Sequence, residues 1–184
     1  MKNEVLALYE RKADGTYIID ISAGNLDELY SHLDRSAIYT KRDLNQNLVE
    51  YLTDCAKDLG SLPYLIRLSI EKVPDDSGVA RIQHSFNKYF SYLAEKERQK
   101  IRVMIHKSSI LLTAGVAILF VSVWFNQWLG VERSVVANVF AQGLTIAAWI
   151  SLWESLATLL LEWLPYRKEM VLYRRLAITP LEIR

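Results

Sequence analysis

The chain has 184 residues, 22 of them basic and 21 acidic, and 51% of all residues are hydrophobic. One cysteine, Cys55, excludes an internal disulfide and any metal site built from several cysteines. The charges are unevenly distributed: none occurs in 108–131 or in 134–153, which argues against a single-domain soluble enzyme and against a disordered chain.

Residues 1–75 are expected to form a small cytosolic α/β domain. Alternating or apolar runs predict a β-hairpin around Asp14-Gly15, and 3–4 spacing of apolar residues predicts two helices. Gly60 is expected to end the second helix, and a last strand is expected to close the sheet. The predicted elements are the strands Val5–Tyr9 and Thr16–Ser22, the helices Leu26–Leu33 and Leu44–Leu59, and the strand Tyr64–Glu71.

A stalk helix with a basic collar is predicted over 76–107. Its helical pattern contains neither Pro nor Gly from Val79 onward and runs directly into the apolar segment 108–129. We therefore expect one continuous helix from about Ser77 to Trp128.

Two charge-free runs predict a transmembrane hairpin, since each is long enough to cross a hydrocarbon core of roughly 30 Å. The first span is assigned to 108–129, the outer loop to 130–134, and the second span with a cytosolic extension to 135–164. Pro165 should end or kink that helix. Residues 165–184 then read as a basic amphipathic tail.

The basic residues predict the orientation of this hairpin. The collar carries five Lys or Arg against two Glu, and the tail is also basic, whereas the loop carries only Glu132 and Arg133. By the positive-inside rule both termini are cytoplasmic, and anionic lipid headgroups are the expected partners of the collar and tail. Residues 1–94 hold 11 basic against 14 acidic residues, so no nucleic-acid partner is expected.

Small residues recur every four positions in the second span, which predicts close packing of another helix against this face. The ladder consists of Gly143, Ala147, Ser151 and Ser155, and the first span has its own small stripe of Ser109, Thr113 and Ala117. A second, polar stripe consists of Asn138, Gln142 and Thr145. Polar residues on two faces favour a homo-oligomer or other membrane subunits.

Glu154 and Glu162 have two possible roles. An ionisable group within a span can belong to an ion or proton path. Alternatively, both carboxylates lie at the inner boundary, where the neighbour of Glu154 across the hairpin would be Lys107 or Ser108, and Glu162 would lie near Arg98 or Lys100. The second role is favoured, because a single acidic group per hairpin is weak support for an ion or proton path.

Catalytic and cofactor motifs are absent from the sequence, so no enzyme, metal or cofactor is expected. Lys41 and Arg42 precede a predicted helix and could contact an anion or a partner. The alternative is that Asp43 caps that helix and both cations are solvated.

Two stretches resemble a family of uncharacterised bacterial two-span inner-membrane proteins that have a small N-terminal cytosolic α/β domain. The first contains Arg42-Asp43-Leu44, Glu50-Tyr51-Leu52 and Cys55-Ala56; the second contains Trp149–Leu156, Glu162–Pro165 and Arg174–Ala177. The resemblance implies a multi-pass protein of the bacterial inner membrane and adds no reaction.

The sequence therefore predicts a non-enzymatic integral membrane protein that acts by interaction, as a self-assembling scaffold or anchor or as an accessory subunit. The alternative is a ligand-gated oligomeric effector or channel with a cytosolic sensor domain.

Overall fold

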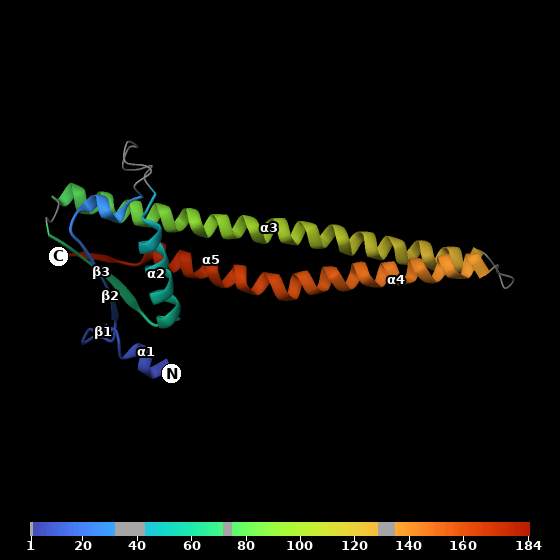
Figure 1. Cartoon of the computed structure of the whole chain (residues 1–184), viewed down its shortest axis with the longest axis horizontal. Coiled ribbons are helices and arrows are strands. Elements are labelled where there is room, and N and C mark those ends of the chain that lie inside the picture. Colours follow the sequence, from blue (N-terminus) through green and yellow to red (C-terminus); the bar gives the residue numbers. More distant parts are fainter. Residues whose placement is uncertain (1, 32–42, 72–74, 129–134) are drawn as a thin grey trace. The chain divides into compact units, whose positions relative to one another are not determined.

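The computed structural model describes residues 2–31, 43–71, 75–128 and 135–184 (Figure 1). The chain divides into two compact units. The first consists of Met1–Lys96 with Glu169–Arg184, and the second of Glu97–Lys168. Lys41, Arg42 and the predicted outer loop 130–134 lie outside the described residues.

The first unit is built on a four-stranded sheet in the order β1-β2-β3-β4 (Figure 1). The strands are β1 (Glu10–Arg11), β2 (Tyr17–Ala23), β3 (Tyr64–Ile70) and β4 (Leu181–Ile183). β1 is antiparallel to β2, whereas β2, β3 and β4 are mutually parallel. The expected small α/β domain is therefore a mixed sheet, and its last strand comes from the end of the chain.

The predicted β-hairpin is present, but its first strand is shorter and later than predicted. Gly15 has φ +89°, and Asp14 accepts a hydrogen bond of 2.9 Å from the Thr16 amide, which lowers the pKa of the Asp14 carboxyl. The prediction of a strand at Val5–Tyr9 is wrong. The helix α1 (Lys2–Leu6) precedes the hairpin, and Leu6 and Tyr9 pack against the core as partly buried residues.

The connection from β2 to β3 passes through the 3-10 helix η1 (Leu26–Leu29) and the helix α2 (Gln46–Leu59). The side chain of Asn45 caps α2 by accepting from the Asn47 amide at 3.0 Å, and Gly60 ends it with φ +59°. α2 buries Leu52, Cys55, Ala56 and Leu59. A helix that stops at Gly60 and buries Cys55 agrees with the prediction, but α2 begins at Gln46 rather than at Leu44, which forms an isolated bridge with Tyr30.

The C-terminal segment completes the core of this unit, which the sequence did not predict. Leu176 and Ala177 of α5 (Trp163–Ile178) lie in one buried cluster with Ile82, Phe86 and Phe90 of α3 (Asp76–Trp128). β4 then pairs with β3, so the prediction that 64–71 closes the sheet is wrong. Apolar residues in the predicted tail 165–184 are buried here because they fill the core over the sheet.

Arg175 fastens this segment to the turn after α2. Its guanidinium donates to the carbonyl oxygens of Gly60 and Leu62, the latter at 2.8 Å, and lies 5.0 Å from the ring centroid of Tyr64. Burial raises the pKa of the Tyr64 phenol, although the nearby Thr179 side chain and, to a smaller extent, Arg175 act against it. By geometry, the Tyr64 hydroxyl has no hydrogen-bond partner among the described residues.

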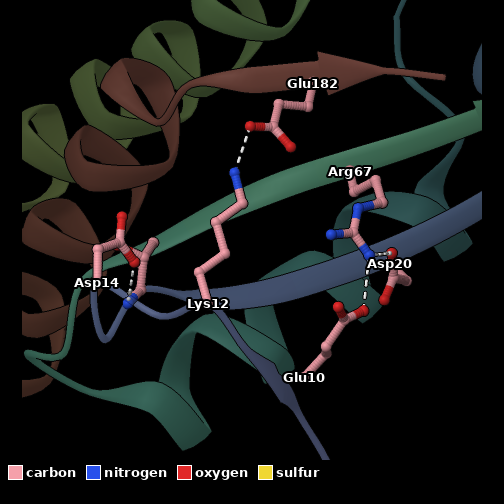
Figure 2. A network of polar contacts seen from close by, with 7 residues as sticks. Glu10, Lys12, Asp14, Asp20, Arg67 and Glu182 are labelled. Carbon is pink, nitrogen blue, oxygen red and sulfur yellow. Dashed lines mark hydrogen bonds and ion pairs between the residues drawn. The ribbon is translucent and has the colours of Figure 1, made fainter.

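Ion pairs tie together the opposite, polar face of the sheet (Figure 2). Arg67 bonds Glu10 at 2.7 Å and Asp20 at 3.4 Å, and Lys12 reaches Glu182 on β4 at 2.5 Å. These pairs connect all four strands. The hydrogen bond to Glu10 is the main reason that the pKa of Arg67 is raised.

The second unit consists of two long helices. α3 runs unbroken over Asp76–Trp128, which confirms the predicted continuous stalk, and α4 covers Val135–Ala157. Pro165 does not end the helix: a π-helical turn, η4 (Thr158–Glu162), precedes it and α5 continues. The wider turn accommodates Pro165. Its ring would clash with the preceding turn of a regular α-helix, and its backbone nitrogen donates no hydrogen bond.

Two helices are long and apolar enough to cross a membrane, over Gly78–Phe125 and Asn138–Ile178. Only 17% of the most apolar stretch of each is buried. The core helix of a soluble protein would be mostly buried, and these two helices differ from such a helix because most of their apolar surface is exposed.

Candidate functional site

The two helices of the second unit meet along a row of buried residues, which we call the seam. Along each helix these residues fall on positions reached by alternating steps of four and three residues. The average period of 3.5 residues is typical of paired helices. The seam consists of Glu97, Met104, Ser108, Gly115 and Ser122 of α3, with Ala141, Ala148 and Ser155 of α4 and Thr158 of η4.

Hydroxyl groups link the helices at two levels of the seam. The hydroxyls of Ser122 and Thr145 lie 2.8 Å apart, and Ser155 donates to the carbonyl oxygen of Ser108 at 2.8 Å. These contacts fix which residues of α3 and α4 lie at the same height. The contact between Ser155 and Ser108 shifts the register by one residue from the prediction of Glu154 opposite Ser108, and by two from Glu154 opposite Lys107.

Gly115 allows the helices to approach closely between these two levels. A Cβ atom on Gly115 would lie 3.1 Å from Cγ of Leu152 and 3.2 Å from Cβ of Ser151. Such distances are shorter than most real contacts of a Cβ atom, so the backbones meet here because residue 115 has no side chain.

Most of the seam was missed from the sequence, although its signal is present there. The prediction followed residues four apart, which traces a face that drifts around the helix, whereas the 4-3 spacing stays on the contact line. Ser155 belongs to both patterns. Thr145 was assigned to the polar stripe but bonds Ser122 in the seam.

Gly143 and Ala147 of the predicted small ladder face away from the seam, whereas Ser151 lies beside Gly115 at its edge. Gly143 and Ala147 are exposed, and a Cβ on Gly143 would have no atom within 4 Å. Ser151 is half-buried and its hydroxyl donates to the carbonyl oxygen of Ala147 on its own helix. These small residues therefore remain accessible outside the hairpin.

The predicted small stripe of the first span is also exposed. Ser109, Thr113 and Ala117 are all solvent-accessible, and Thr113 donates to the carbonyl oxygen of Ser109. Of the residues predicted for packing, only Ser151 and Ser155 therefore contribute to the internal packing of the hairpin.

The expected charge pairs across the hairpin are not formed. Glu154, Glu162 and Lys107 are exposed, and within the described ranges none of them has an ion-pair partner. Lys100 instead pairs with Glu97 at 2.5 Å and lies 5.7 Å from the ring centroid of Tyr166. Glu97 takes this cation because it lies one helical turn away.

Glu97 is a buried carboxylate at one end of the seam. Only 5% of the residue is exposed, and its second oxygen, Oε2, has no hydrogen-bond partner. No sequence pattern singled it out, since it was counted among the collar charges. A carboxylate held by one lysine makes this end of the seam polar.

Large apolar and polar side chains are exposed around the outside of the hairpin. Asn138 and Gln142, the two other members of the predicted polar stripe, are exposed. The exposed aromatic residues include Phe120, Trp124, Trp128, Phe140, Trp149 and Trp153, each more than 60% accessible. In water such a surface would be unfavourable, so it requires a covering of lipid or protein.

The sheet unit has a shallow hollow of about 450 Å³ at the carboxyl ends of its parallel strands, where ligands commonly bind in open parallel sheets. Ser22, Gly24, Ser69, Glu71 and Arg184 line it. A second hollow beside it is lined in part by Glu28, whose carboxylate accepts from the Gly24 amide at 3.0 Å. The described lining includes acidic and basic side chains, so its charge does not indicate a class of ligand.

Comparison with protein families, with curated proteins and with solved structures finds no match to this chain.

Proposed function

We propose that this chain is an integral membrane protein whose hairpin of α3 and α4 crosses the bilayer and anchors the sheet domain. The observation that carries the proposal is the exposed apolar surface of the hairpin. Apart from Met104 and Glu97, the seam buries only small residues, and the largest apolar side chains of α3 and α4 along the hairpin lie outside it. Contact of such an apolar surface with lipid chains costs no free energy, whereas its exposure to water is unfavourable.

Both ends of the hairpin emerge on one side of the membrane in this proposal. Residues before the hairpin and residues after it fold into one compact unit, which requires them to be on the same side. The basic collar and the basic start of α5 favour the cytoplasm for that side, next to anionic headgroups. The membrane is the bacterial inner membrane, as the resemblance implies.

The protein acts by interaction rather than by catalysis, and its first partner is a second copy of the same chain. The seam joins α3 to α4 within one chain and leaves Gly143 and Ala147 exposed. A face of small residues next to lipid allows a further helix to pack closely. An accessory role in a larger membrane complex uses the same face with a foreign helix.

The test is the mass and composition of the particle extracted gently from its native membrane. A homo-oligomer supports self-assembly, and a stoichiometric foreign subunit supports the accessory role. A soluble monomer that needs neither detergent nor lipid contradicts the proposal. Gly143→Leu should lower the assembled fraction, because it fills the face that the partner occupies.

A second candidate, an oligomeric channel or ligand-gated effector, is favoured by the polar groups left exposed on α4. Asn138, Gln142 and Glu154 are all accessible in an otherwise apolar helix, and an assembly could direct them toward a pore. Ion flux through liposomes that contain the oligomer, abolished by Glu154→Gln, would support this function. An assembled oligomer without flux would argue against constitutive conduction.

A further inference from the structure

Two acidic and two basic residues of the hairpin have no ion-pair partner among the residues that the structure describes. Glu154 and Glu162 are exposed, as are Arg102 and His106 on α3. Among the described residues no ion pair includes any of the four. At the boundary of a hydrocarbon core an unpaired carboxylate is costly, so a neighbouring cation stabilises it.

These groups lie on two faces that point away from the seam. On α4 one exposed face consists of residues at 4-3-4 spacing, and we call it the outer face of α4: Gly143, Ala147, Ile150 and Glu154. On α3 the same spacing gives the outer face of α3: Arg102, His106, Ser109 and Thr113. Eleven residues separate Gly143 from Glu154, which at about 100° per residue returns the side chain to within roughly 20° of the same direction.

The contacts in the seam give the relative heights of these groups. Ser155 bonds Ser108, so Glu154 lies within about one helical turn of the height of His106. Glu162 follows Ser155 by seven residues, and the same number counted back from Ser108 along the antiparallel helix reaches Ile101, next to Arg102. All copies in one membrane have the same orientation, so these heights also hold between neighbouring copies.

Charge decides which faces can meet. If two copies packed through α4 against α4, each Glu154 would face the Glu154 of the other copy at the same depth, and the two would repel. If α4 packed against the outer face of α3, the acidic groups would meet Arg102 and His106 instead.

We propose that the outer face of α4 in one copy docks on the outer face of α3 in a second copy, with Glu154 near His106 and Glu162 near Arg102. The inference rests on the self-assembly proposed above and specifies its interface. Such a contact is head-to-tail, since each copy presents a different face on each side. Repeated around an axis normal to the membrane, it closes into a ring rather than a two-fold dimer.

The test is disulfide cross-linking between two differently tagged full-length copies in membrane vesicles, both with Cys55→Ser. One copy carries Glu154→Cys and the other His106→Cys. The expected result is a cross-linked pair that contains both tags. As the matched control, the His106→Cys copy is combined with Gln142→Cys, which is exposed on a different face of α4 and should cross-link several-fold less.

A charge reversal provides a second measurement that does not depend on cysteines. Glu162→Arg should lower the assembled fraction several-fold, and adding Arg102→Glu in the same chain should restore it. Cross-linking that is dominated by Glu154→Cys with itself or by Gln142→Cys, in an intact oligomer, would overturn this interface and leave self-assembly standing. A monomer before any substitution would contradict the proposed self-assembly itself.

Discussion

Gly115 and Gly143 form a matched pair, because the same substitution should have opposite consequences at the two positions. Gly115→Leu places a side chain where even a Cβ atom would lie 3.1 Å from Leu152. Overpacking of this kind costs about 1–3 kcal/mol. Separation of the helices would also break the hydrogen bond from Ser155 to Ser108, which contributes about 1 kcal/mol. Gly143→Leu meets no atom within 4 Å in its own chain, so the hairpin should close as before.

The closed hairpin can be measured by disulfide formation between Ser122→Cys and Thr145→Cys, whose native hydroxyls lie 2.8 Å apart. The background is Cys55→Ser, and the protein is full length in lipid vesicles. A loss of about 2–4 kcal/mol predicts that Gly115→Leu lowers the closed fraction, and with it the rate of cross-linking, by more than about tenfold. Gly143→Leu should cross-link at the parental rate and yet assemble poorly. Equal rates for both variants would refute the assignment of the seam.

Three further predictions concern the sheet domain. Arg175→Met removes two hydrogen bonds to the turn after α2, so hydrogen exchange of β4 should accelerate in line with a loss of about 2–4 kcal/mol; unchanged exchange would contradict the role of this clamp. Tyr64→Phe removes a buried hydroxyl without a partner, so stability at neutral pH should stay equal or rise. Because burial raises the pKa of Tyr64 in the folded state, its stabilising contribution is complete below the unfolded value of 10.0 and declines as pH rises toward the folded value. The parental protein should therefore lose stability above that pH, and Tyr64→Phe should lose less of it when thermal melting is measured at alkaline pH. Lys12 and Glu182 are partly exposed, so a double-mutant cycle with Lys12→Met and Glu182→Gln should give a coupling below about 1 kcal/mol.

Local patterns predicted the elements that local physics determines. The turn at Asp14-Gly15, the helix that Gly60 ends and the long helix to Trp128 all depend on residues close together in the chain. The helix α1 was missed because Val5–Tyr9 is too short and apolar for its period to distinguish a strand from a helix.

Long-range partners were beyond the sequence patterns. Nothing near Leu181–Ile183 indicates that this segment pairs with β3, more than a hundred residues earlier, because a three-residue strand has no reliable period. The small residues of the two long helices illustrate the same limit. The sequence pattern singled out small residues four apart, but only tertiary contacts show that Gly115 lies in the seam and Gly143 outside it.

β4 follows both long helices in the sequence, which has a consequence for biosynthesis. The ribosome makes β1, β2 and β3 first and both long helices afterwards, so the sheet lacks β4 until both helices have been made. If the hairpin crosses a membrane as proposed, Leu176, Ala177 and β4 reach the sheet only after insertion with both ends of the hairpin on the same side. A chain inserted with one helix missing would then leave the edge of β3 and part of the core uncovered, a state that cellular proteases and chaperones recognise. In that topology, completion of the sheet reports on correct insertion.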